Sequence, residues 1–311
     1  MMPEGSDAGA EAAQSRAAAT SSASTKYARR MRVIDSVAQL RAALDPVRRR
    51  GGRIGLVPTM GALHEGHLTL IREAARVSDE VVVSVFVNPM QFTDAADLAA
   101  YPRDPETDAA MAAAAGATVV FTPSPGEVYP AGFSTGIRVG GVSEPWEGAA
   151  RGAAHFDGVA LVVTKLFFMV GADAAWFGRK DAQQVAVVRR LVRDLNIPIE
   201  IHAVPTVRDT DGLALSSRNV RLSAADRDQA LAIPRSLATA RAAVADGETD
   251  AASLTARAIA SLRTAGIEPE YWAIVDPDSF APLTRIEAEA LAIVAAPVGG
   301  VRLIDNELLR P

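Results

Sequence analysis

The chain has 311 residues, of which 49% are hydrophobic and 22% are charged, with a formal net charge of −5. This length and composition predict about two globular domains and argue against a disordered or membrane-embedded protein. The acidic balance argues against a general nucleic-acid binder, and the absence of cysteine excludes disulfides, thiol nucleophiles and Cys-ligated zinc and favours a cytoplasmic location.

The first 30 residues are a low-complexity stretch of Ala, Ser, Gly and Thr without the apolar core of a secretory signal. We interpret residues 1–30 as a disordered tail. An organellar transit peptide is the alternative, because four basic residues lie between positions 16 and 30, but the early acidic residues count against it. The longest apolar run of the chain, residues 159–172, contains Lys165, so we expect no membrane-spanning segment.

From residue 53 onward, short runs of β-branched residues alternate with stretches of helical periodicity. We expect strands at residues 53–58, 81–87, 118–122, 174–178 and 198–204, and helices at residues 66–77, 105–115, 156–170 and 181–195. Alternation of this kind is typical of βαβ units. It predicts the α/β class, with a Rossmann-like, doubly wound and mostly parallel sheet covered by helices on both faces.

After about residue 205 the character of the sequence changes. A polar loop leads into Ala-rich helices at residues 223–246 and 250–265 and then into short strands at residues 271–275, 290–296 and 301–304. This pattern predicts a smaller C-terminal α+β domain. We therefore expect one domain at residues 31–206 and a second at residues 207–311.

The sharpest motif is the stretch PTMGALHEGH, Pro58 to His67, placed where an expected strand ends and a helix begins. Parallel sheets bind ligands at this end of their strands, and a helix N-terminus attracts anions such as phosphate. Gly61 would permit a tight turn, and Gly66 would leave room for a nucleotide. His64 and His67 could both donate hydrogen bonds to one phosphate. Two surface histidines in a turn are the alternative.

A second polar stretch, FGRKDAQQ at residues 177–184, again joins a strand to a helix. Asp181 could cap the helix, which would leave Lys180 directed across the sheet edge that carries the histidines. A lysine there would neutralise charge on a phosphoryl group. The alternative is a capped helix with a solvated lysine.

The polar loop contains the stretch LSSRN, residues 215–219. Its two hydroxyl groups and its guanidinium could close over a bound nucleotide as a phosphate clamp. Serine-rich loops are common, so the stretch means little alone.

Three neutral amides, Asn88, Gln91 and Gln184, could orient the hydroxyl and carboxylate groups of a polar substrate without adding charge. Turn capping would also explain Asn88, which precedes a proline, and solvent exposure would explain the two glutamines. His202 lies within an expected strand, so we expect a structural role for it.

Together these segments resemble the pantoate–β-alanine ligase family, the pantothenate synthetases, within the nucleotidyltransferase superfamily that has a His-x-Gly-His signature. The resemblance extends from about residue 31 to residue 305. Its motifs follow in order at residues 58–67, 86–92, 155–166, 178–184 and 216–219. Five ordered motifs are far more specific than the superfamily signature, which fits many adenylyl and cytidylyl transferases.

The resemblance implies an AMP-forming ligase that makes pantothenate, a precursor of coenzyme A, in two steps. Pantoate would attack the α-phosphorus of ATP to give pantoyl adenylate and pyrophosphate, and the amine of β-alanine would then displace AMP. The implied cofactors are ATP as co-substrate and Mg²⁺ as its counter-ion, because the motifs offer no all-protein metal cage. The family also implies nucleotide and pantoate binding by residues 31–206, a lid at residues 207–311, and a homodimer without nucleic-acid or membrane partners.

The same resemblance assigns site residues. The implied catalytic residues are His67 as proton donor, His64 as phosphate stabiliser, and Lys180 and Arg218 on the phosphates. Gln91 and Gln184 would hold pantoate, and Gln91 would also border β-alanine. The implied nucleotide-binding residues are Met60, Gly61, Ala62, Leu63, His64, Glu65, Gly66, His67, Gly178, Arg179, Lys180, Asp181, Val207, Leu215, Ser216, Ser217 and Arg218.

Some positions depart from the family pattern. Arg179, Ala182 and Leu215 replace a usual Glu, an aromatic residue and a Met, and we expect them to tune binding rather than abolish it. The loop from Arg151 to His155 is one residue longer than the family's, so we leave both residues out of the catalytic set. Two alternatives stay open: another nucleotidyltransferase of the superfamily, and a nucleotide-binding relative that has lost catalysis.

Overall fold

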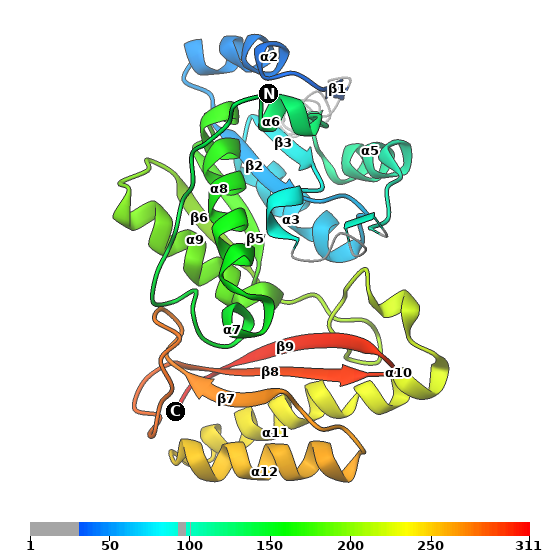
Figure 1. The fold of residues 1–311 in the computed structure, drawn as a ribbon, viewed down its shortest axis with the longest axis vertical. Helices are drawn as coiled ribbons and strands as arrows, with labels where there is room; N and C mark the ends of the chain where they lie inside the picture. The colour runs from blue at the N-terminus through cyan, green and yellow to red at the C-terminus, as the bar shows by residue number, and fades with distance from the viewer. Residues whose placement is uncertain (1–30, 93–97, 100) are drawn as a thin grey trace, which may run out of the picture.

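A computed structural model gives the fold over residues 31–92, 98–99 and 101–311 (Figure 1). The expected tail, residues 1–30, lies outside these described residues. Within them, a six-stranded parallel sheet is covered by helices, and a three-stranded antiparallel sheet is backed by further helices. The α/β class predicted from the alternation of elements is confirmed.

The larger sheet has the strand order β1-β4-β3-β2-β5-β6, and each neighbouring pair is parallel. The chain moves outward in one direction from β2 and in the other from β5, so the topological switch point lies between these two strands. Ligands of open parallel sheets bind at such a point. The strands are β1 (Arg32–Ile34), β2 (Ile54–Thr59), β3 (Glu80–Val85), β4 (Val119–Phe121), β5 (Ala174–Gly178) and β6 (Glu200–Val204).

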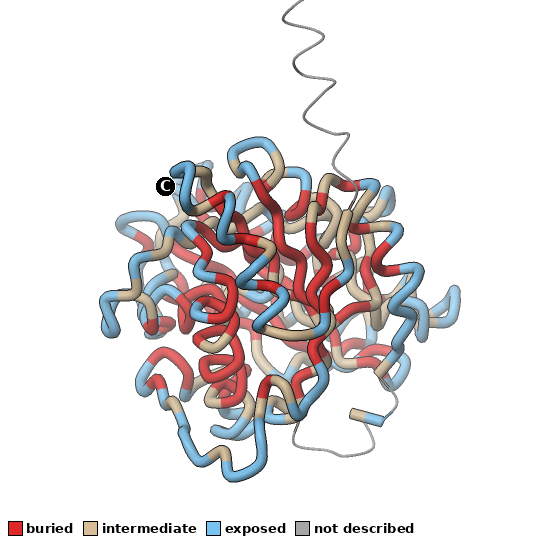
Figure 2. The backbone as a smooth tube through the Cα atoms, turned by 90° about the horizontal axis from the view of Figure 1, so that it is seen from above, coloured by how far each residue is buried: buried red, intermediate tan, exposed pale blue. Residues whose placement is uncertain are grey.

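Helices cover both faces of this sheet, which is why its central strands are buried along nearly their whole length (Figure 2). One face packs against α2 (Val37–Arg49), α8 (Ala153–Val170) and α9 (Ala182–Asp194). The other face packs against α3 (Glu65–Val77) and α5 (Pro105–Ala115). The shorter helical segments are α6 (Pro125–Val128), α7 (Glu147–Arg151), η1 (Pro89–Gln91), η2 (Arg179–Asp181) and η3 (Asn219–Arg221).

Helix α8 is long and apolar enough, by length and composition, to cross a membrane. In this fold 67% of it is buried, chiefly against the six-stranded sheet and its neighbouring helices. A helix that is apolar nearly all round is expected in such a position, because packed neighbours surround it. Burial in the core therefore accounts for its composition.

The small sheet, in the order β7-β8-β9, lies between the larger sheet's half of the molecule and its own helices (Figure 1). Alternate residues of its strands face opposite ways. Trp272 and Ile274 pack toward the helices, whereas Ala273 and Val275 join the core of the larger sheet. Its elements are β7 (Tyr271–Val275), β8 (Ala290–Val298), β9 (Val301–Leu309), α10 (Ala224–Ala230), α11 (Ala232–Ala245) and α12 (Ala251–Thr264).

The sequence analysis missed two elements, and two of its expected elements have the wrong extent. The alternating pattern is recognisable only from residue 53, so the edge strand β1 and helix α2 were not predicted. The helix expected at residues 223–246 is two helices that meet at Leu231, because Pro234 lacks the N–H that would bond the carbonyl of Ala230. Strand β9 continues to Leu309 rather than ending at residue 304, and these extra residues reach the site described below.

Candidate active site

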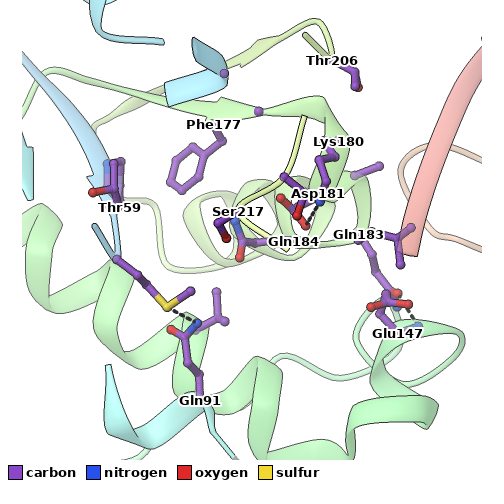
Figure 3. A pocket seen from close by; sticks show the side chains of 18 of the residues that line it. Thr59, Gln91, Glu147, Phe177, Lys180, Asp181, Gln183, Gln184, Thr206 and Ser217 are labelled. Carbon is purple, nitrogen blue, oxygen red and sulfur yellow. Dashed lines mark hydrogen bonds and ion pairs between the residues drawn. The ribbon is translucent and has the colours of Figure 1, made fainter. Parts of the chain in front are cut away.

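A cavity of about 320 Å³ opens at the carboxyl edge of the six-stranded sheet (Figure 3). It lies at the switch point, because Met60 and His64 follow β2 and Lys180 follows β5. The small sheet supplies the facing side through Ile304 and Asn306 of β9. A cavity of this size and position suits a small-molecule ligand.

Most of the predicted site residues meet in this one cavity although they are far apart in the sequence. Those that line it are Met60, His64, Gly66, His67, Gln91, Gly178, Lys180, Asp181, Gln184, Val207, Leu215, Ser216, Ser217 and Arg218. Five others are not among its lining residues: Gly61, Ala62, Leu63, Glu65 and Arg179. Glu65 instead pairs with Arg72 further along α3.

His64 and His67 are joined by a reciprocal cap at the start of α3. Nδ1 of His64 accepts a hydrogen bond from the N–H of Gly66 at 3.1 Å, and Nδ1 of His67 accepts one from the N–H of His64 at 3.3 Å. A neutral imidazole whose Nδ1 accepts carries its proton on Nε2. The ring centroids lie 4.2 Å apart, so the pair offers two neighbouring Nε2–H donors.

Both imidazoles are uncharged near pH 7. Burial, and to a smaller extent the nearby His64, lower the pKa of His67 to about 3. Burial also lowers the pKa of His64, and so does the charge of Lys180. In this state each ring can donate a hydrogen bond to an oxyanion, but neither is an imidazolium acid.

The turn between β2 and α3 is held by a buried carboxylate that the sequence analysis did not identify. Asp108 of α5 accepts hydrogen bonds from the N–H groups of Ala62 at 3.0 Å and Leu63 at 2.8 Å. Gly61 has a φ of +85°, and a Cβ there would lie 2.8 Å from the Asp108 carboxylate. The signal that could have found Asp108 is a lone acidic residue among alanines on the inner face of an expected helix.

Gly66 lines the cavity, and the structure shows a further reason for a glycine at this position. A Cβ at this position would lie 2.8 Å from Cε1 and 2.9 Å from Nδ1 of His64. The glycine therefore lets the His64 ring lie against the first turn of α3 and cap the helix.

Lys180 lies in the turn η2, where its Nζ is 3.5 Å from Oδ1 of Asp181 (Figure 3). Asp181 occupies the N-cap position of α9 but makes no side-chain cap hydrogen bond, so the expected capping role is wrong. Asn306 of β9 donates hydrogen bonds from Nδ2 to the backbone oxygens of Arg179 at 2.8 Å and Lys180 at 2.9 Å. The small sheet therefore holds the turn that carries Lys180.

The loop after β6 brings the Ser-Ser-Arg segment to the same cavity. Oγ of Ser216 accepts a hydrogen bond from the N–H of Arg218 at 3.3 Å, which shapes the turn. Tyr101 and Ser217 both line the cavity. Arg218 thus joins Lys180 and the two imidazoles among the groups that could bind an anion.

Gln91 is oriented by a buried amide. Nδ2 of Asn88 donates to Oε1 of Gln91 at 3.1 Å and to the backbone oxygen of Gly158 at 3.1 Å, while Oδ1 of Asn88 accepts from the hydroxyl of Tyr129 at 2.7 Å. The Nε2 of Gln91 then lies 3.2 Å from Sδ of Met60. Asn88 also caps η1, so its expected capping role is confirmed. Its second role is to orient Gln91.

The opposite side of the cavity is apolar. Six apolar side chains form it. Four of the six lie at helical spacing on one face of α8, one lies in β5, and one directly follows β3. Such a surface suits a branched aliphatic group. The residues are Phe86, Phe156, Val159, Val163, Leu166 and Phe177.

A buried ion-pair cluster connects the two sheets at the edge of the cavity. Glu147 of α7 accepts hydrogen bonds from both terminal nitrogens of Arg302 at 2.6 and 2.8 Å, and from the hydroxyl of Tyr271 at 2.7 Å. Arg151 adds a contact at 2.9 Å. Burial acts to raise the pKa of Glu147, but the bonds from Arg302 and Tyr271 outweigh it and hold that pKa at about 2.

Arg151, at the end of α7, lines the cavity. His155 also lines it and lies in the first turn of α8. Its Nδ1 is 2.9 Å from the backbone oxygen of Gln91. The longer loop therefore brings both residues to the site, although the sequence analysis left them out of the catalytic set.

Among the described residues, no group of three or more His, Asp or Glu side chains could hold a metal ion. The cavity instead combines hydrogen-bond donors and cations on one side with apolar side chains and amides on the other. The first side suits phosphates, and the second suits a small branched acid.

The comparisons with known proteins identify the family of this chain. The family model for pantoate-beta-alanine ligase matches residues 32–308. The chain is 52% identical over 282 residues to the pantothenate synthetase of Rhizorhabdus wittichii, covering 90% of this chain and 99% of the relative. It is 53% identical over 275 residues to that of a Chelativorans species, covering 88% and 96%.

Solved structures give the same result. The pantothenate synthetase of Thermus thermophilus has a TM-score of 0.82 at 46% identity, over 90% of this chain and 100% of that one. The Francisella tularensis pantoate-beta-alanine ligase, complexed with beta-gamma ATP and β-alanine, has a TM-score of 0.72 at 32% identity, over 90% and 98%. The chain therefore belongs to the pantoate–β-alanine ligase family, the ATP-dependent enzymes that join pantoate to β-alanine through a carbon–nitrogen bond.

Proposed function

We propose that this ligase works through a pantoyl-adenylate intermediate, releasing pyrophosphate in the first step and AMP in the second. The observation that carries this proposal is the division of one cavity between an anion-binding side and an apolar side bearing amides. A carboxylate cannot expel oxide, so it must first gain a better leaving group. Its attack on the α-phosphorus requires positive charge and in-line positioning rather than a protein nucleophile.

In the first step, hydrogen-bond donors and cations would stabilise the charge that develops on the phosphates. Gln91 and Gln184 would orient the carboxylate and hydroxyl groups of pantoate, and the face of α8 would receive its methyl groups. The donors on the phosphate side are the Nε2–H groups of His64 and His67, the ammonium of Lys180 and the guanidinium of Arg218.

ATP and β-alanine are the ligands named for the Francisella tularensis structure, which supports the same ligands here. We propose that Mg²⁺ enters as a complex with ATP, because the described residues hold no cluster that could bind it first. Bound to the phosphates, the ion would neutralise part of their charge.

We further propose a homodimer in the cytoplasm, with residues 207–311 acting as a lid over residues 31–206. The family resemblance supports the dimer, and the absence of cysteine favours a reducing compartment. Lining residues from β9 on the far side of the cavity support the lid. Sedimentation of the full chain would test the dimer.

Isotope exchange between pyrophosphate and ATP, with Mg²⁺ and pantoate present and β-alanine absent, tests the adenylation step. We expect exchange that depends on pantoate. No exchange from a folded, ATP-binding chain would favour an inactive nucleotide-binding relative. Exchange that depends on a different acid would favour another nucleotidyltransferase of the superfamily.

A further inference from the structure

The three histidines that line the cavity differ in which ring nitrogen carries the proton. In His64 and His67, Nδ1 accepts from a backbone N–H, so the proton is on Nε2. In His155, Nδ1 faces the backbone oxygen of Gln91 at 2.9 Å. A carbonyl oxygen can only accept, so Nδ1 of His155 must carry the proton, and Nε2 has a free lone pair while the ring is neutral.

From this contrast we propose that His155 accepts the proton of the β-alanine amine in the amide-forming step. The proposal rests on the acyl-adenylate route proposed above, and it adds a catalytic group for the second step.

The Nε2 atom of His155 is accessible for this task. No other described residue hydrogen-bonds this atom. The atom is also not fully buried. The ring lies edge-on to Phe156 with centroids 5.0 Å apart, and Nδ1 is held by Gln91. These two contacts fix the plane of the ring beside the glutamine that would border β-alanine.

The ring is also neutral near pH 7. Burial lowers the pKa of His155, and the charge of Arg151 lowers it further, against the opposing effects of the Gln91 carbonyl, Glu147 and Asp181. The charged groups that influence it are therefore Arg151 and Glu147 on α7 and Asp181 on η2. A neutral imidazole is the form that can accept a proton.

The other lining groups that could accept a proton are already engaged. Glu147 is bonded to Arg302, Tyr271 and Arg151, as described above. Asp181 lies beside Lys180 at 3.5 Å, and Asp305 accepts two hydrogen bonds from Arg208 at 2.6 and 3.0 Å. Nδ1 of His64 and of His67 accepts from the backbone. Among the described lining residues, His155 is thus the imidazole with a free acceptor nitrogen.

The step balances without a further reagent. The lone pair of the β-alanine nitrogen forms the C–N bond to the pantoyl carbonyl carbon, and the nitrogen becomes strongly acidic as the bond forms. One N–H proton passes to Nε2 of His155. The bond between the carbonyl carbon and the phosphate oxygen breaks, and AMP leaves with that electron pair. The imidazolium then loses its proton to water.

Two variants separate proton acceptance from positioning. In His155→Asn, the side-chain amide can still donate to the Gln91 oxygen, but the acceptor at Nε2 is lost. In His155→Gln, an amide atom lies near the Nε2 position but is a very weak base, and the Nδ1 donor is lost. General base catalysis typically contributes a factor of about 10² to 10⁴.

We expect both variants to retain pantoate-dependent pyrophosphate exchange and to lose at least about 10²-fold in the single-turnover reaction of bound pantoyl adenylate with β-alanine. At a fixed concentration of unprotonated β-alanine amine, the rate of that reaction in the unaltered chain should fall as the pH decreases through the pKa of His155, and this acid limb should be absent in the variants. Hydroxylamine is far less basic than β-alanine, so its nitrogen becomes acidic enough during attack to lose its proton to water. It should react with the bound adenylate at a similar rate in all three proteins.

The matched control is His202→Asn, the same change at a histidine outside the cavity, which should leave both half-reactions unchanged. Normal amide formation in His155→Asn would overturn the proposal, and so would an equal loss in both half-reactions, which indicates positioning. If the unaltered chain shows no pantoate-dependent exchange, the adenylate route itself fails, and that result is distinct from a failure confined to His155.

Discussion

The ion pair between Glu147 and Arg302 should contribute strongly to stability, because it is buried and links the two sheets. The side chains are only 10% and 25% exposed. A pKa lowered from 4.5 to about 2 corresponds to about 3 kcal/mol of stabilisation of the ionised form. Removing one partner of a buried pair costs about 3–5 kcal/mol by comparison. We therefore expect Glu147→Gln to lower the free energy of unfolding by about 3 kcal/mol.

Chemical unfolding followed by tryptophan fluorescence measures this loss, because the ring of Trp146 lies 5.4 Å from that of Tyr271 in the same interface. The pKa is depressed in the folded chain, so the stabilisation is complete above pH 4.5 and is lost as the pH falls toward 2. The unaltered chain should lose stability in that window by about 3 kcal/mol more than the variant.

The matched control is Glu268→Gln, which also breaks a two-bond pair with an arginine. Glu268 and Arg263 are 69% and 61% exposed, so we expect a much smaller loss of unfolding free energy than for Glu147→Gln. The reasoning about burial is wrong if Glu147→Gln lowers the free energy of unfolding no more than Glu268→Gln does. It is also wrong if the stability of Glu147→Gln depends on pH in the same way as that of the unaltered chain.

Two further variants test how the site is held in place. Asn306→Ala removes two hydrogen bonds of about 1 kcal/mol each from the turn that carries Lys180. We expect the KM for ATP in pyrophosphate exchange to rise about tenfold. The control is Trp146→Phe, which removes the hydrogen bond from Trp146 to the backbone oxygen of Phe280 and should leave that KM unchanged. Asp108→Ala leaves the buried N–H of Leu63 and the partly buried N–H of Ala62 without their partner and should cost about 2–4 kcal/mol in unfolding free energy. A loss below about 0.5 kcal/mol would contradict the anchoring role.

The sequence predicts which hydrogen-bond donors and cations meet in the cavity, for a geometric reason. The carboxyl ends of parallel strands lie at one edge of a sheet, so motifs that follow β2 and β5 must meet there. This argument predicted that His64 lies near Lys180, although the sequence gives no contact between them. His202 likewise has the structural role expected, because its ring stacks on Trp176 outside the cavity, with centroids 4.7 Å apart.

What the sequence could not predict depends on contacts between distant segments. Asn306 and Glu147 act through partners more than 120 residues away, and no local pattern marks such pairs. The edge strand β1 has only three residues, too few for a periodicity to be recognised. The contact between the His64 ring and Gly66 was not predicted either, because the position of that ring depends on side-chain packing rather than on spacing.

The transfer of oxygen from pantoate to AMP tests the proposed route most directly. Pantoate labelled with ¹⁸O in its carboxylate is converted with ATP, Mg²⁺ and β-alanine, and the phosphate-containing products are analysed by mass spectrometry. If pantoyl adenylate forms, one labelled carboxylate oxygen remains on phosphorus when AMP leaves, so AMP carries ¹⁸O and pyrophosphate does not. Unlabelled AMP, or label in inorganic phosphate formed together with ADP, would contradict the account.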